Sequence, residues 1–305
     1  MSTTTVPPVP WHRQIDWLGL MPFFAMHLGV LAVFWVGVTW PVFIVAFFSY
    51  VIRGMALTGF YHRYFSHKAF ATSRWFQFVW AFIGCAAAQR GPIWWAAHHR
   101  DHHSYSDEPP DVHSPHQHHF LWSHMGWFMT TENAAVREKR VPDLLKFPEL
   151  VFIDRHFWIA VVTWGAGCWG LGALLQRWFP TSGITGAQMF VWAFVVATVF
   201  LYHVTYCINS LAHVIGSRRF ITTDQSRNNF VLALFAFGEG WHNNHHYYPA
   251  SARNGFYWWE VDVTYYMIWA FSKLGLVWDV KPVPERVLEM GRTGNPALAG
   301  SVAGE

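Results

Sequence analysis

Charged residues are scarce in this chain of 305 residues. Asp, Glu, Lys and Arg make up 13% of it, whereas 53% of the residues are hydrophobic and 19% are aromatic. Soluble domains typically contain roughly 25% charged residues, so an ordinary water-soluble domain is excluded and an integral membrane protein is predicted. The small excess of basic residues, 21 Lys and Arg against 18 Asp and Glu, gives no reason to expect a nucleic-acid partner.

Several other signals are absent. The three cysteines, Cys85, Cys168 and Cys207, lie in separate apolar runs, which excludes a disulfide framework and a CxxC site and predicts small buried residues. No Gly-rich phosphate loop occurs, and the one GxGxxG match, Gly165 to Gly170, lies within an apolar run predicted to span the membrane, so no nucleotide site is expected. Residues 1–16 lack the basic region of a cleaved signal and are predicted to be a cytosolic N-terminal tail.

Four apolar runs are long enough to cross about 30 Å of hydrocarbon as helices. They predict an all-α membrane protein with one domain over 17–285, in which two helical hairpins carry a cytosolic helical cap, followed by a flexible tail over 286–305. With both termini inside, Arg177 is the one basic residue on the outer side, as the positive-inside rule favours. The four predicted spans are residues 17–36, 40–61, 157–179 and 187–215.

Two further apolar stretches are not predicted to span. If residues 75–88 crossed the membrane, the histidines on either side of them would lie on opposite faces, so this stretch is expected to lie in the interface or to return. Residues 256–278 contain Glu260, Asp262 and Lys273, each costing about 2.5–3.5 kcal/mol at the bilayer centre, and are expected to form an amphipathic interfacial helix. Arg53, within the second span, is expected to extend its head toward the interface.

Histidine motifs at the cytosolic ends of the runs are the main functional signal. Two HxxHH motifs repeat the offsets i, i+3 and i+4, which place three imidazoles on one helix face about 5–6 Å apart. An HxxxxH motif and an Asn-His pair at i, i+4 follow two of the apolar runs. Packing alone does not explain such repeated clusters, so metal binding is predicted. The motif residues are His62, His67, His99, His102, His103, Asn209, His213, His242, His245 and His246.

The number of imidazoles exceeds what one ion can bind, so two ions are expected. Imidazole suits zinc, copper, iron and nickel, and the residues alone do not exclude copper. A redox-capable pair beside an apolar membrane pocket favours iron and dioxygen chemistry on a lipid chain. Acidic side chains are expected to orient the rings, namely Asp101, Asp107, Asp111 and Glu239. The lone histidines His27, His156 and His203 are read as ordinary packed residues.

In order and spacing, these motifs resemble those of the integral-membrane fatty acyl desaturases, specifically the delta-9 acyl-CoA and acyl-lipid branch. The resemblance runs from about residue 20 to Gly294 and includes the phrases His103-Ser-Tyr-Ser-Asp107 and Ser123-His-Met-Gly-Trp127. It implies that the nine motif histidines bind two irons, that Asn209 reaches one iron through water, and that dioxygen is a co-substrate.

The resemblance also implies a narrow bent tunnel for the acyl chain. Gln89, Trp95 and Thr205 match the family's residues at the bend, and Tyr50 and Gly54, twelve and eight residues before His62, are hypothesised to close the methyl end. In animal acyl-CoA enzymes, Arg-Asp precedes the second motif, but here Ala97 and His98 stand there. The headgroup, CoA or glycerolipid, therefore stays open, with Arg90, Arg100, Arg137, Lys139 and Arg140 available to either phosphate.

The expected activity is insertion of a cis double bond, between carbons nine and ten, into a saturated acyl chain. Electrons would come from a ferredoxin or a b-type cytochrome with its reductase, because no such module is apparent in the sequence. The stretch 89–95 is more similar to bacterial and cyanobacterial members, which favours the bacterial inner membrane with a cytoplasmic active site. Two alternatives stay open: a di-iron hydroxylase of alkanes, carotenoids or fatty acids, and, from another class, a histidine-rich metal transporter.

Overall fold

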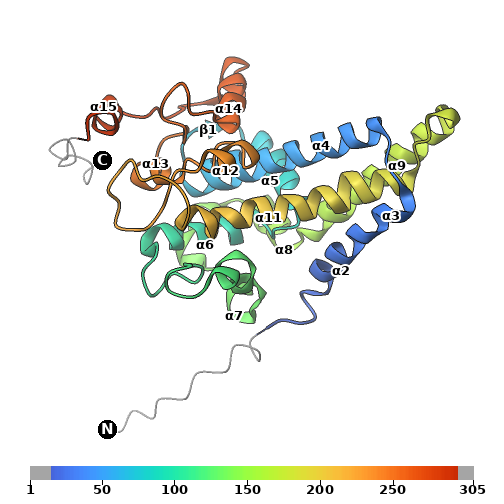
Figure 1. Ribbon diagram of the computed structural model, residues 1–305, viewed down its shortest axis with the longest axis horizontal. Coiled ribbons are helices and arrows are strands. Elements are labelled where there is room, and N and C mark those ends of the chain that lie inside the picture. Colours follow the sequence, from blue (N-terminus) through green and yellow to red (C-terminus); the bar gives the residue numbers. More distant parts are fainter. Residues whose placement is uncertain (1–14, 295–305) are drawn as a thin grey trace, which may run out of the picture.

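The computed structural model describes residues 15–294. Within this range long helices run side by side at one end of the molecule, and shorter helices gather at the other end (Figure 1). The long helical stretches are the two-part helix α4 (Trp40–Met55) and η2 (Ala56–Ser66), then α9 (Trp158–Trp178), then the run of α10 (Gly186–Met189), η8 (Phe190–Val196), α11 (Ala197–Asn209) and η9 (Leu211–His213).

All three stretches are long and apolar enough to cross a membrane: Trp40–Ser66, Trp158–Trp178 and Gly186–His213. The first predicted span is shorter than expected. It forms α2 (Met21–Gly29), the 3-10 turn η1 (Val30–Ala32) and α3 (Val33–Val36), and Met21–Val36 is classed with the shorter apolar helices. At 1.5 Å per residue this stretch reaches only about 24 Å.

The remaining elements form the cap. Turns at Gly37 and Gly183, both at positive φ, reverse the chain between the long helices, and β1 pairs antiparallel with β2 through Ala71 and Trp278. The short turn η7 (Pro180–Ser182) lies between α9 and α10, away from the cap. The cap elements are β1 (Ala71–Thr72), α5 (Arg74–Cys85), α6 (Pro92–Tyr105), η3 (Trp122–Gly126), η4 (Trp127–Met129), α7 (Thr131–Ala134), η5 (Glu138–Arg140), η6 (Leu144–Lys146), α8 (Pro148–Arg155), α12 (Phe230–Phe235), α13 (His242–Tyr247), α14 (Val263–Lys273), β2 (Val277–Trp278) and α15 (Glu285–Thr293).

The π-helix η2 positions the HxxxxH motif. The backbone N–H of His67 donates to the carbonyl of His62 at 3.2 Å, which is the i to i+5 bond of a π-helix. In an α-helix, residues five apart point about 140° away from each other. The wider π turn brings both rings to one side, with centroids 4.9 Å apart.

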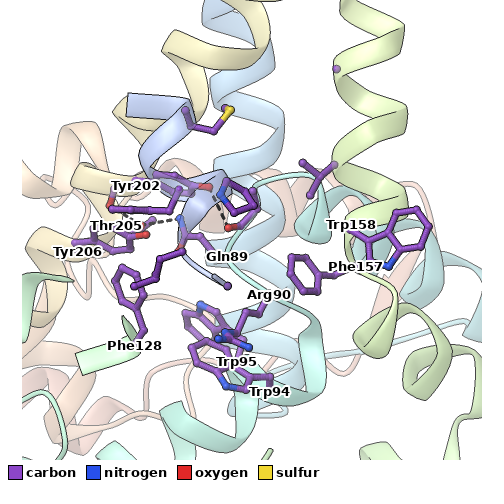
Figure 2. A pocket seen from close by; sticks show the side chains of 18 of the residues that line it. Gln89, Arg90, Trp94, Trp95, Phe128, Phe157, Trp158, Tyr202, Thr205 and Tyr206 are labelled. Atoms are coloured by element: carbon purple, nitrogen blue, oxygen red, sulfur yellow. Dashed lines mark hydrogen bonds between the residues drawn. The ribbon is translucent and has the colours of Figure 1, made fainter. Parts of the chain in front are cut away.

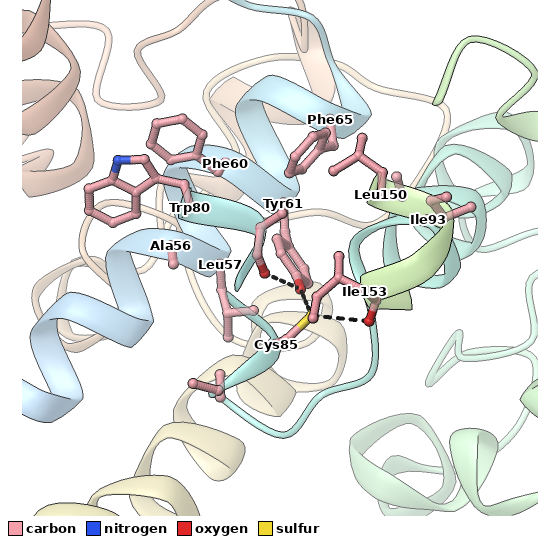
Figure 3. Close-up of a cluster of buried hydrophobic side chains, with 14 of the residues drawn as sticks. Ala56, Leu57, Phe60, Tyr61, Phe65, Trp80, Cys85, Ile93, Leu150 and Ile153 are labelled. Atoms are coloured by element: carbon pink, nitrogen blue, oxygen red, sulfur yellow. Dashed lines mark hydrogen bonds between the residues drawn. The ribbon is translucent and has the colours of Figure 1, made fainter. Parts of the chain in front are cut away.

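A buried cluster holds η2 in place against α5 and α8 (Figure 3). Phe60 stacks on Trp80 with centroids 4.8 Å apart. The Tyr61 hydroxyl donates to the carbonyl of Ala81 and contacts the Cys85 sulfur, each at 3.1 Å. Cys85 is fully buried, as the sequence predicts for this small residue, and α5 is a packed helix rather than a span.

Three expectations about segments are wrong. Arg53 does not reach the interface but is fully buried, donating to the carbonyls of Ser49 and Ala86 at 3.0 and 3.2 Å and to Thr198 Oγ1. The stretch 256–278 is not one helix, because α14 begins only at Val263. The predicted C-terminal tail starts as helix α15, which buries Val287 and Met290, and residues 295–305 of that tail lie outside the described range, as do residues 1–14 of the N-terminal tail.

Candidate metal centre and adjoining cavity

Five of the predicted histidines come together at the end of η2. Ring nitrogens of His62, His67, His99, His103 and His245 all lie within 4.8 Å of one another. The Nε2 atoms pair closely, at 2.8 Å between His67 and His99 and 3.0 Å between His62 and His245 and between His103 and His245. We call these residues the five-histidine group.

The other four histidines form a second group beside the first. It contains His102, His213, His242 and His246, again with ligand atoms within 4.8 Å. The Nε2 atoms of His213 and His242 are 3.0 Å apart. We call this the four-histidine group. Helices α6 and α13 contribute to both groups, so the two groups adjoin, as the reasoning from two ions requires.

The chemistry of both groups fits metal ions. Burial lowers the pKa of His67, His99, His103, His242 and His245 well below the usual value, so these rings are neutral donors at pH 7. Metal–imidazole bonds of about 2.0–2.1 Å place two ligands at right angles about 3 Å apart, which matches the Nε2 separations. Several imidazoles facing one point without a shared partner would be costly, and an ion removes that cost.

Carboxylates hold the outer nitrogens of four rings. Oxygens of Glu239, Asp111, Asp107 and Asp224 accept from Nδ1 of His62 (2.6 Å), His102 (2.9 Å), His213 (2.8 Å) and His246 (2.7 Å). Such a bond fixes the tautomer and turns Nε2 toward the metal. The hydrogen bonds from His213 and Ser114 outweigh the effect of burial and hold the pKa of Asp107 well below its usual range.

The sequence reasoning misjudged one carboxylate and missed another. Asp101 contacts no histidine ring but pairs with Arg140 at 2.6 Å and with Arg137. Asp224 was not predicted, because it is a lone acid in the long segment between the third and fourth motifs, with no spacing that links it to His246. Only the fold brings the two together.

A large cavity of about 1040 Å³ begins beside the metal groups. His99 and Asn209 line its inner end together with Gln89, Trp95 and Thr205. Gln89 Nε2 donates to Thr205 Oγ1 at 2.8 Å, and Trp95 stacks on His99 with ring centroids 4.9 Å apart. Figure 2 shows Gln89 and Thr205 joined across the cavity wall, with Tyr202, Tyr206 and Phe128 beside them. The cavity is mostly aromatic and aliphatic, which suits a hydrocarbon chain.

The family model for fatty acid desaturases matches residues 34–279. The chain belongs to the fatty acid desaturase family. It is 35% identical over 278 residues to delta-9 acyl-lipid desaturase 1 of Arabidopsis thaliana, covering 89% of this chain and 86% of that protein. The sn-1 stearoyl-lipid 9-desaturase of Anabaena variabilis is 34% identical, covering 92% and 97%, and a probable acyl-CoA desaturase of Schizosaccharomyces pombe is 32% identical, covering 92% and 58%. The protein is therefore a desaturase that acts on fatty acyl chains.

Two residues predicted to close the methyl end of the tunnel, Tyr50 and Gly54, do not line the large cavity. Tyr50 packs between Phe200 and Phe237, with ring centroids 5.0 Å apart in both cases, and its hydroxyl donates to the carbonyl of Phe235. A Cβ on Gly54 would lie 2.1 Å from the Phe237 ring. The structure gives both positions a packing role against Phe237.

The cavity of the desaturase also carries buried polar atoms close to the histidine groups. His98 Nδ1 and Trp127 Nε1 have no hydrogen-bond partner among the described residues, although both side chains line the cavity and are at least nine-tenths buried. Trp94 contacts both rings, with its centroid 4.5 Å from that of His98 and 5.7 Å from that of Trp127. The Arg90 guanidinium lies over Trp94.

The remaining histidines lie outside the two histidine groups. His27 and His203 satisfy each other, with Nε2 atoms 3.3 Å apart, and His203 Nδ1 also contacts His124 Nε2 at 3.0 Å. His118 and His119 are exposed. His116 is exposed as well, but its Nε2 donates to the carbonyl of His213 at 3.0 Å, so it also helps to hold that ligand segment.

Proposed function

We propose that the protein is a dioxygen-dependent delta-9 desaturase that converts a saturated acyl chain into a cis-monounsaturated one. The single observation that carries the proposal is the position of His99 and Asn209, which belong to the metal motifs and also line the inner end of the apolar cavity. A chain in this cavity would present a methylene group next to the ions. In the overall reaction, the saturated chain, one dioxygen, two electrons and two protons give the monounsaturated chain and two waters.

The ten motif residues would hold two irons, the nine histidines directly and Asn209 through water. Iron held by these residues would supply the redox chemistry with dioxygen. The protein supplies neutral nitrogen ligands, fixed tautomers from Glu239, Asp111, Asp107 and Asp224, and a cavity with a mainly apolar wall. Because hydrocarbon carbons are chemically alike, the position of the double bond follows from where the chain is held.

Gln89, Thr205 and Trp95 are the residues proposed to hold the chain at the reacting carbons. The bond between Gln89 and Thr205 joins the loop after α5 to α11, and Thr205 Oγ1 is itself fixed by the carbonyls of Leu201 and Tyr202 at 2.9 Å each. This bridge forms a rigid part of the wall, and Trp95, stacked on His99, forms the surface next to the ions. Tyr50 and Gly54 are proposed to act on chain length only through Phe237, which they contact.

A chain esterified in a glycerolipid is the proposed substrate. Trp158, Val162 and Trp169 of α9 line the cavity yet are 55%, 61% and 57% exposed, as expected for a wall that opens toward the bilayer. The unpartnered donor Trp127 Nε1 suits an ester oxygen of such a lipid. The names of the plant and cyanobacterial relatives, which describe lipid-linked substrates, support the same choice.

The proposed membrane arrangement has four spans, with both termini and the histidine groups on the cytoplasmic side of a bacterial inner membrane. Three helices support it by length, and the shorter Met21–Val36 stretch would cross with local thinning of the bilayer. The electron donor would be a ferredoxin or a b-type cytochrome with its reductase.

Expression in a host that lacks unsaturated chains, with gas chromatography of the fatty acid methyl esters, tests the function. The wild type should produce chains with one double bond at carbon nine, first in intact glycerolipids and only later in the acyl-CoA pool. His245→Ala should produce none. Hydroxylated chains would instead support the hydroxylase alternative, and early products in the acyl-CoA pool would contradict the lipid substrate.

A further inference from the structure

A second cavity reaches the metal groups from a different direction. It measures about 270 Å³ and has His103 of the five-histidine group and His246 of the four-histidine group in its wall. We call it the vestibule. The other residues that line it come from the end of α6, from the segment before α12 and from α13, and are Ser104, Ser106, Glu108, Ile221, Thr222, Thr223, Asp224 and Tyr247.

The vestibule differs chemically from the large cavity. All but one of its lining side chains carry a polar atom, whereas the large cavity is walled mainly by Trp, Phe, Tyr and aliphatic groups. A divalent ion that entered through an apolar, membrane-facing wall would lose its hydration with nothing to replace it, at a cost of many kcal/mol. Carboxylate and hydroxyl oxygens, by contrast, can replace water around such an ion stepwise before imidazole binds it.

One wall of the vestibule is a hydrogen-bonded loop, residues 218–226. Arg218 donates to the carbonyls of Thr222 and Asp224 at 3.0 and 2.8 Å, and the Thr222 hydroxyl donates to Asp224 Oδ1 at 2.9 Å. Asp224 Oδ2 in turn holds His246. At the tip of this loop Ile221 is 90% exposed, so the loop stands beside the opening and is fixed without covering it.

We propose that the vestibule is the route by which hydrated ferrous ions reach and leave both histidine groups. This inference rests on the proposed iron function, and it assigns to Glu108, Thr222 and Thr223 a role in passing ions between solvent and the ligands His103 and His246. Because the vestibule touches one ligand of each group, a single opening serves both ions.

The test uses a removable plug placed after the irons have been loaded. Thr223 is exposed, so Thr223→Cys in a Cys207→Ala background can be labelled with a bulky thiol reagent, since Cys85 and Cys168 are buried. Release of iron to a ferrous chelator is followed by absorbance in detergent. Labelling should leave two irons bound. The adduct should then slow the release of iron to the chelator at least tenfold, and it should slow reloading of the apoprotein by the same factor. Cleavage of the adduct with a thiol should restore the wild-type rate.

Val162→Cys in the same background is the matched control, because Val162 is exposed and lines the large cavity instead. Its adduct should leave iron release unchanged. Unchanged or faster iron release from the Thr223 adduct, or slower release from the Val162 adduct, would contradict the vestibule as the route for iron. The double-bond assay tests the proposed function separately. A wild type that binds no iron overturns both.

Discussion

Asp107→Asn should weaken one of the two ions selectively. Asp107 Oδ2 accepts from His213 Nδ1 at 2.8 Å and from the Gln225 N–H at 2.8 Å, and Oδ1 accepts from Ser114 Oγ at 2.6 Å. An asparagine can keep its oxygen on His213 and Gln225, and it loses only the hydrogen bond from Ser114, because an NH₂ group cannot accept it. Asp107 has φ +60°, a conformation that Asn tolerates well, so the backbone should not change.

What the substitution removes is the negative charge behind the His213 ring. Loss of such an outer partner typically costs 10- to 100-fold in metal affinity, or about 1.4–2.7 kcal/mol. His213 belongs to the four-histidine group alone. The five-histidine group keeps its own carboxylate, Glu239 on His62, so its ion should be bound as in the wild type.

The assay equilibrates the protein against graded concentrations of a ferrous chelator and measures its iron content by plasma mass spectrometry. The wild type should lose its iron in two steps of one ion each. In Asp107→Asn one step should move by 10- to 100-fold and the other should stay. Asp101→Asn is the matched control, because Asp101 pairs with arginines instead of a histidine, and it should titrate like the wild type. Two unmoved steps, or two steps moved together, would refute the reasoning.

Four further changes have defined outcomes. Gln89→Leu removes the bond to α11 and should spread the double bond over neighbouring positions, seen by mass spectrometry of derivatised products; one unchanged position would contradict it. Trp127→Phe removes one buried donor, worth about 1 kcal/mol, and should raise KM about fivefold with kcat nearly unchanged. Gly54→Ala crowds Phe237 and should cost about 1–3 kcal/mol of stability, measured by thermal unfolding. Burial lowers the pKa of His246 from 6.5 to about 4. Between these two pH values the unfolded chain binds a proton on His246 that the folded apoprotein does not bind. The contribution of His246 to apoprotein stability should therefore be constant above pH 6.5 and fall as the pH is lowered toward 4.

The sequence predicted elements whose signals are local. Apolar length predicted the long helices, and the histidine motifs predicted which side chains meet, although their spacing did not predict that each HxxHH trio divides between the two groups. Prediction from the sequence failed where partners from distant segments decide the environment of a side chain. Arg53 looked like a residue that extends to the interface, but carbonyls from two other segments satisfy it inside the protein. Asp224 had no local signal at all, and Glu260 and Asp262 are buried acids that bind Arg219 and Arg63, not the polar face of a helix.

The HxxHH motifs show the same division within one stretch of helix. In α6, His99 and His103 join the five-histidine group while His102, between them, joins the other. In α13 the pattern is reversed, since His242 and His246 join the four-histidine group and His245 crosses to the first. Residues at i and i+4 lie almost directly above each other on a helix, whereas i+3 lies to the other side of that line. Each motif therefore gives two rings to one group and one ring to the other, which ties the two histidine groups together through the helices α6 and α13 and explains why the spacing recurs.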